Sequence, residues 1–278
     1  MTQHKADPCG QRPAGAGPLD PLSIDHDRLV RINATMARYV PAQLADDLMH
    51  DRRPLPPWLP ASAATASAAP PRVRSTLATI LFVDIRGFSE LSAHLSPFAT
   101  IRLLDEFFSM VVNCIDSHGG MIDKFLGDGA MATFGVPATT PGDADRAVEA
   151  ASAMLRGIDD WNCRRRAAGD PEISIGIGID TGLVVFGTIG AATRMDYTVI
   201  GDCVNTAAKL QQASEDHGAR ALISAHTHAQ LARGHGLTTT GPVCIGRHAR
   251  RISAYQLPLS QAHDVADAGE PLSETIAA

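Results

Sequence analysis

Apolar and polar residues along this chain follow two periods, one typical of strands and one typical of helices. Short apolar runs predict strands over residues 77–84, 121–125, 130–134, 197–200, 221–224, 237–240 and 251–256. Apolar residues at helical spacing predict long helices over residues 97–118, 143–166 and 202–217, and a short helix from residue 225. Residues 173–181 and 184–189 predict a hairpin that turns at Gly182.

This order of elements predicts an α+β fold. Strands and long helices form two βαβ-like units together with hairpins, so we expect helices on one face of a mixed sheet. The 278 residues of the chain suffice for one domain of ordinary size with extensions at its ends.

The composition divides the chain into five parts. Residues 1–22 are rich in Pro and Gly and predict a disordered N-terminus without a secretory signal. Residues 23–50 predict an amphipathic helical segment, either regulatory or dimerising, or simply packed on the main domain. Residues 51–75 are a Pro/Ala-rich linker, residues 76–257 form the main domain, and residues 258–278 are a flexible tail.

Charge and cysteine content exclude several classes of protein. The formal net charge is −6, so the chain does not have the excess of Lys and Arg that binding to nucleic acid or anionic lipid requires. The five cysteines are scattered, which argues against a disulfide framework or a zinc site and favours a reducing, cytoplasmic location. Because no apolar segment is long enough to span a membrane, we expect a soluble protein.

Two aspartates stand where a predicted strand gives way to a glycine-containing bend. Asp84 ends an apolar strand, and Asp128 lies in the turn of the hairpin that follows Lys124. Taken singly, each is an ordinary turn residue. Two adjacent carboxylates together are a typical binding site for Mg²⁺, which retains several waters and takes substrate phosphates as further ligands. Two ions held in this way stabilise the attacking and leaving oxygens of a phosphoryl displacement.

The residues around these aspartates form three motifs, in the order FVDIRGFS at 82–89, DKFLGDGAMA at 123–132 and DYTVIGDCVNTAAKL at 196–210. Over residues 76–257 the chain thereby resembles the catalytic domain of class III nucleotidyl cyclases. This resemblance implies a ferredoxin-like (βαββαβ) sandwich, shared with polymerase palms, with added strands. It also implies attack of the ribose 3′-hydroxyl on the α-phosphorus of a nucleoside triphosphate, with loss of pyrophosphate.

The resemblance assigns metal binding to Asp84, Asp128 and the backbone carbonyl of Ile85. The cofactors it implies are two Mg²⁺ or Mn²⁺ ions per site. With a metal-activated hydroxyl, no protein general base is required.

By the same resemblance, Lys124 and Thr198 recognise the purine base. Guanylate cyclases typically carry Glu with Cys or Ser at this pair, whereas a subgroup of adenylate cyclases has Thr at the second position. Lys with Thr therefore points to ATP. Without the family, Lys124 is a solvated lysine on a strand edge and Thr198 a β-branched residue that fills a strand.

Asn205 and Lys209 lie four residues apart and therefore share one face of a predicted helix. The resemblance implies that Asn205 orients the ribose and that Lys209 stabilises charge on the α-phosphate, although the family usually has Arg there. Lysine lacks the planar fork of arginine, which puts the turnover rate in question. The family's lysine for the phosphates is missing from residues 244–248, where Arg247 is the nearest cation and takes that role.

The leading hypothesis is an adenylate cyclase that converts ATP to 3′,5′-cyclic AMP as a homodimer. The family places each site across the dimer interface, with the metal-binding aspartates from one subunit and the remaining site residues from the other: Lys124, Thr198, Asn205 and Lys209. Two alternatives remain, a degenerate cyclase-like domain that binds nucleotide with little turnover, and a guanylate cyclase.

Overall fold

A computed structural model describes residues 73–191, 194–245 and 250–258 of the chain. The predicted N-terminus 1–22, the helical segment 23–50, residues 51–72 of the linker and residues 259–278 of the tail lie outside them. Arg247 also lies outside the described residues, so its assignment to the phosphates stays a prediction.

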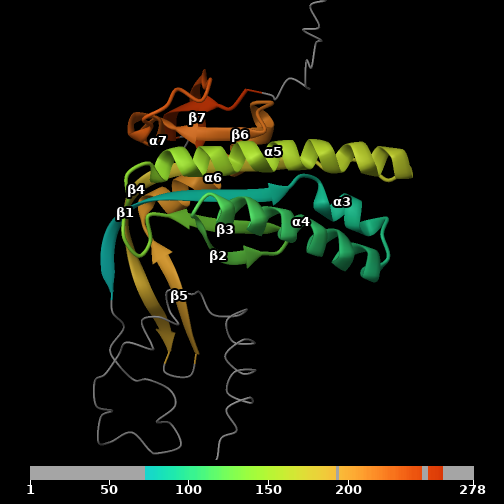
Figure 1. Ribbon diagram of the computed structural model, residues 1–278, viewed down its shortest axis with the longest axis horizontal. Coiled ribbons are helices and arrows are strands. Elements are labelled where there is room, and N and C mark those ends of the chain that lie inside the picture. The colour runs from blue at the N-terminus through green and yellow to red at the C-terminus, as the bar shows by residue number, and fades with distance from the viewer. Residues whose placement is uncertain (1–72, 192–193, 246–249, 259–278) are drawn as a thin grey trace, which may run out of the picture.

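The centre of the fold is an antiparallel sheet of four strands in the order β2-β3-β1-β4 (Figure 1). These strands are β1 (Arg74–Ile85), β2 (Met121–Leu126), β3 (Gly129–Phe134) and β4 (Ile175–Ala191). Helix α4 (Pro97–Ser117) joins β1 to β2, and α5 (Asp143–Ala168) joins β3 to β4. This is the βαββαβ arrangement of a ferredoxin-like fold, and the predicted α+β class is confirmed.

Helices α4 and α5 cover one face of this sheet. Alternate residues of β1, Leu81 and Val83, point to that face and are buried against Phe107 of α4 and Met154 of α5. The alternating apolar residues of the strand and the helically spaced apolar residues of α4 and α5 therefore pack into one core, as the apolar pattern predicts.

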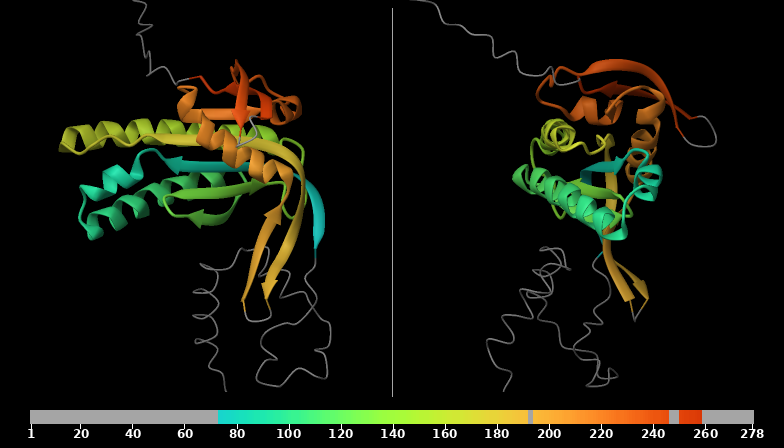
Figure 2. Two further views of the ribbon diagram at one scale, coloured as in Figure 1. Left: turned by 180° about the vertical axis from the view of Figure 1, so that it is seen from behind. Right: turned by 90° about the vertical axis from the view of Figure 1, so that its right-hand side faces the viewer.

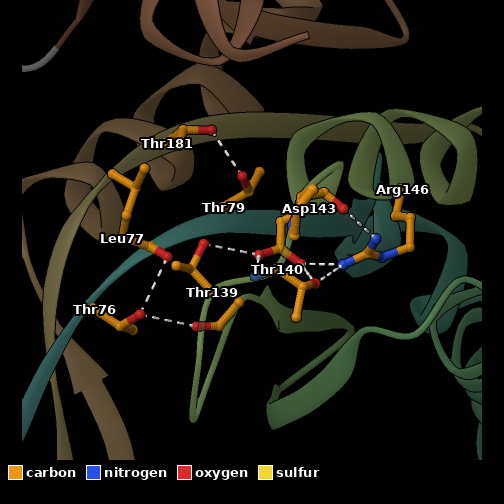
Figure 3. A network of polar contacts seen from close by, with 10 residues as sticks. Thr76, Leu77, Thr79, Thr139, Thr140, Asp143, Arg146 and Thr181 are labelled. Carbon is orange, nitrogen blue, oxygen red and sulfur yellow. Dashed lines mark hydrogen bonds and ion pairs between the residues drawn. The ribbon is translucent and has the colours of Figure 1, made fainter. Parts of the chain in front are cut away.

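The start of α5 is fixed by a polar cluster around Asp143, which is itself buried (Figure 3). The Asp143 carboxylate accepts hydrogen bonds from the backbone N–H of Thr140 at 2.7 Å and from the hydroxyl of Thr139 at 3.1 Å, and it forms an ion pair with Arg146. The N-cap residue is Gly142, whose backbone is in the left-handed region and which has no side chain to cap the helix. Asp143, the first residue of the helix, instead holds the first turn through its hydrogen bonds and its negative charge near the helix N-terminus.

The opposite face of the sheet is covered by α6 (Asp202–Asp216), so the expectation that helices lie on one face holds only for α4 and α5. Glycines of β4 allow this close approach. A Cβ atom added to Gly178 would lie 2.1 Å from the carbonyl oxygen of Ala207, and one added to Gly176 would lie 2.7 Å from Ser214 Oγ. Helix backbone therefore rests almost directly on strand backbone.

The predicted hairpin that turns at Gly182 is wrong, because β4 continues without a break from Ile175 to Ala191. Gly182 pairs with Ala78 of β1 in mid-strand. A Cβ atom at Gly182 would lie 3.0 Å from the Cβ of Cys203 in α6, so this glycine marks helix–strand contact and not a turn. Sequence alone does not distinguish these two uses of glycine.

The long β4 strand pairs with β5 (Arg194–Ile200) beyond the central sheet, and the two form an arm that extends away from α4 and α5 (Figures 1 and 2). On the other side of β4, β6 (Ala221–Ser224), β8 (Arg250–Gln256) and β7 (Thr238–Ile245) extend the sheet. Helix α7 (Ala225–Gln230) follows β6, and α3 (Phe88–Ala93), which the sequence pattern did not predict, follows β1. Within the described ranges, no helix has the length and apolarity needed to cross a membrane.

Candidate active site

Asp84 and Asp128 lie side by side at one end of the central sheet. Asp84 is the second-last residue of β1 and pairs with Gly129, the first residue of β3, which directly follows Asp128. A Cβ atom at Gly129 would lie 2.8 Å from the carbonyl oxygen of Val83 and 3.1 Å from Asp84 Cγ, so a larger residue would displace the carboxylate. Sheet pairing thus brings together two carboxylates that are 44 positions apart in the sequence.

The electrostatics of this pair suit a bound cation. Burial, together with the hydrogen bond to Asp128 and its charge, raises the pKa of Asp84 to about 7, and the backbone N–H of Ile85 opposes this only in part. Oδ1 of Asp84 is buried without a hydrogen-bond partner. The nearby guanidinium of Arg86 is directed elsewhere, since it donates to Ser214 Oγ at 2.8 Å and to the carbonyl of Ala219. Among the residues that the structure describes, no ion pair joins a cationic side chain to Asp84 or Asp128.

The donor set fits Mg²⁺ or Mn²⁺ bound through two carboxylates and completed by substrate and water. In the described part of the chain, no group of three or more His, Cys, Asp and Glu side chains gathers around one point. Magnesium is typically held by one or two carboxylates plus phosphate oxygens, so two aspartates with an unpartnered buried oxygen are sufficient. The predicted role of the Ile85 carbonyl stays a prediction.

Lys124 of β2 and Thr198 of β5 are in direct contact, although 74 residues separate them in the sequence. The Lys124 ammonium donates a hydrogen bond to Thr198 Oγ1 at 2.9 Å. The pairing of β5 with β4 places Thr198 within hydrogen-bond distance of Lys124 on the edge strand β2. The two residues predicted to recognise the base therefore form one unit in the fold.

A third residue, Asp123, belongs to this unit and was not identified from the sequence. Thr198 Oγ1 donates to Asp123 Oδ2 at 3.1 Å, and Lys124 Nζ lies 3.3 Å from the same oxygen. Burial raises the pKa of Asp123, and the contacts with Lys124 and Thr198 oppose this rise. Neighbouring strand residues normally point to opposite faces, but the pairing of β2 with β3 shifts between Ile122 and Lys124, and this bulge lets Asp123 and Lys124 reach the same hydroxyl.

Asn205 and Lys209 lie on the exposed side of α6, one helical turn apart. Their shared face is as predicted. Within residues 73–191, 194–245 and 250–258, no hydrogen bond or ion pair joins either side chain to the Asp84–Asp128 pair or to Lys124. Within a single chain, the predicted site residues thus form three groups that no hydrogen bond or ion pair between described residues connects.

The profile of the adenylate and guanylate cyclase catalytic domain matches residues 72–257 of this chain. The chain belongs to this family. The cyclase domain is 36% identical to the crystallised adenylyl cyclase CyaB from P. aeruginosa, with a TM-score of 0.63 over 68% of this chain and 97% of that one. It is 30% identical to a crystallised guanylyl cyclase, with a TM-score of 0.58 over 66% of this chain and 92% of that one.

Among curated proteins, an adenylate cyclase from Anabaena cylindrica is 40% identical over 150 residues, which are 52% of this chain and 29% of the relative. The chain thus covers less than a third of that relative's length. Likeness to both adenylyl and guanylyl cyclases establishes a nucleotidyl cyclase domain. It does not distinguish adenine from guanine, because enzymes of both kinds are among the similar structures.

Proposed function

We propose that this cyclase is a cytoplasmic adenylate cyclase that converts ATP to 3′,5′-cyclic AMP and pyrophosphate. The observation that carries the choice of substrate is the hydrogen bond between Lys124 and Thr198. It supports a base-recognition unit that combines an ammonium donor with a hydroxyl, in place of the Glu with Cys or Ser typical of guanylate cyclases.

Adenine presents an amino donor at its 6-position and an acceptor at N1, whereas guanine presents an acceptor at the 6-position and a donor at N1. A lysine at N1 and a hydroxyl oxygen at the 6-position match adenine. In the same pose, the Lys124 ammonium would face the N1–H of guanine, and both groups are donors. The Thr198 oxygen would face the 6-oxo group, and both are acceptors. The Lys124–Thr198 unit therefore favours ATP over GTP.

Asp84 and Asp128 would hold two Mg²⁺ or Mn²⁺ ions, which when bound lower the pKa of the ribose 3′-hydroxyl and neutralise charge on the phosphates. Asn205 orients the ribose, and Lys209 places its ammonium at the α-phosphate, where charge develops in the transition state. Arg247 binds the terminal phosphates. Catalysis by these residues consists of positioning and charge stabilisation.

A homodimer explains why the site residues form separate groups within one protomer. In the proposed dimer, Asp84 and Asp128 of one subunit face Lys124, Asn205 and Lys209 of its partner, so each of two equivalent sites draws on both chains. The exposure of Asn205 and Lys209 in the protomer supports this arrangement, because their side chains remain available to a partner-bound nucleotide.

Incubation of the purified protein with ATP or GTP and Mn²⁺, followed by detection of the cyclic product, tests the proposal. Cyclic AMP formed with a higher kcat/KM than cyclic GMP supports it. A preference for GTP would identify a guanylate cyclase. Tight nucleotide binding without either product would identify a degenerate domain.

Replacing Lys209 with arginine should raise kcat about tenfold with little change in KM, because a planar guanidinium fits the α-phosphate better and does so mainly in the transition state. Steady-state kinetics with ATP measure the effect. Lys209→Met is the matched control that removes the charge and should lower kcat. An arginine variant no faster than the parent would show that Lys209 is adapted to its surroundings.

A further inference from the structure

The buried carboxylate of Asp123 lies directly behind the base-recognition unit. Its side chain is 1% exposed, against 33% for Lys124. Oδ2 of Asp123 accepts from the Thr198 hydroxyl and pairs with the Lys124 ammonium, while Oδ1 is buried without a hydrogen-bond partner. A buried carboxylate that is only partly satisfied costs stability. Its presence at this point therefore calls for a functional reason.

Asp123 determines how the Thr198 hydroxyl is used. A hydroxyl has one donor and two acceptor lone pairs. The single proton of Thr198 Oγ1 is directed to Asp123 Oδ2, and one lone pair accepts from Lys124 Nζ. One lone pair of Thr198 Oγ1 remains free to form a further hydrogen bond. With Asp123 ionised, Thr198 can therefore accept a hydrogen bond from a ligand and cannot donate one.

The same carboxylate limits Lys124. Of the three ammonium protons, one is donated to Thr198 Oγ1 and one is directed toward Asp123 Oδ2. One donor remains for a ligand. The unit as a whole presents one donor from Lys124 and one acceptor from Thr198, held at fixed spacing by their mutual hydrogen bond.

We propose that Asp123 is a specificity-determining positioning residue, which makes Thr198 an obligate acceptor and thereby selects the 6-amino group of adenine against the 6-oxo group of guanine. This inference rests on the proposed function. A free threonine hydroxyl would rotate and serve either purine, since it donates as readily as it accepts. Discrimination at the 6-position thus comes from a residue that does not touch the base.

The test compares kcat/KM for ATP with kcat/KM for GTP, together with the affinities for 3′-deoxy-ATP and 3′-deoxy-GTP, which lack the attacking hydroxyl. Asp123→Asn keeps the shape of the side chain but removes the charge, and its amide can donate to Thr198, which frees the hydroxyl to donate to the base. We expect the ATP-to-GTP ratio to fall about tenfold for both turnover and binding.

Asp196→Asn is the matched control, because Asp196 is exposed, lies two residues before Thr198, and acts on Asp123 only through its charge. It should leave the ratio unchanged. Thr198→Val removes the hydroxyl and keeps the branched shape, and should lower the ratio as Asp123→Asn does. In the double variant Asp123→Asn/Thr198→Val the ratio should fall no further, because Asp123 acts through Thr198.

If the wild-type protein and the Asp123→Asn variant favour ATP over GTP by the same ratio, the role of Asp123 is wrong and the proposed function remains intact. A wild-type protein that favours GTP would overturn both. If Asp123→Asn does not fold, Thr198→Val still decides: undiminished preference for ATP in that variant would show that the hydroxyl, and hence Asp123, does not select the base.

Discussion

Replacing Asp84 with asparagine should abolish metal-dependent cyclisation and at the same time stabilise the metal-free protein. We expect kcat with ATP to fall at least about a thousandfold, which corresponds to roughly 4 kcal/mol, because the variant removes a ligand charge at the reacting phosphate. Product formation in Mg²⁺ and in Mn²⁺ measures the loss. Substantial turnover in either metal would contradict the assignment of Asp84 as a ligand.

The gain in stability follows from the pKa of Asp84, which is about 7 in the folded chain against 3.8 for an ordinary aspartate. The folded protein therefore holds a proton that the unfolded chain releases between about pH 4 and pH 7, and stability falls as the pH rises through that window. Asparagine does not ionise. At pH 8 without metal, Asp84→Asn should be more stable by about 1 kcal/mol after allowance for solvent screening, or about 2–4 °C in Tm.

The difference in Tm between variant and wild type should shrink as the pH is lowered from 8 to 5, because wild-type Asp84 then also carries a proton. Metal affinity of the wild type should weaken over the same range, since protons and metal compete for one carboxylate. Asp105→Asn, at an exposed position in the middle of α4, is the matched control and should change neither property with pH. A pH-independent difference in Tm would rule out the raised pKa as its cause.

Mixing the inactive variants Asp84→Asn and Asn205→Ala should restore about a quarter of wild-type activity. In the proposed homodimer these residues serve the same site from different subunits. Random exchange of equal amounts makes half of the dimers mixed, and each mixed dimer has one intact site and one doubly damaged site, which gives the factor of about one quarter. Activity of the mixture at increasing incubation times measures the recovery.

The matched control mixes Asp84→Asn with Asp128→Asn, which damage the same half of the site. Every site in that mixture lacks one metal ligand, so it should stay inactive. A mixture of Asp84→Asn and Asn205→Ala that stays inactive, although native mass spectrometry shows subunit exchange, would disprove the shared site.

The sequence predicted the elements of the central sheet and its two covering helices, because period and segment length are local properties that burial on one face imposes. It did not predict the continuity of β4 through Gly182, because a glycine that admits a helix looks the same as one that makes a turn. Asp84 and Asp128 were recognisable from their motifs. Asp123 was not, since its use depends on a β-bulge in β2 and on the β4–β5 arm.

The glycines of β4 under α6 make positions that carry no reactive side chain intolerant of substitution. Because backbone meets backbone at Gly178, even alanine there would push α6 away from the sheet. The same helix carries Asn205 and Lys209. A shift of about 1 Å in such groups can cost about a hundredfold in rate. Alanine at Gly178 should therefore inactivate the cyclase in a protein that remains folded.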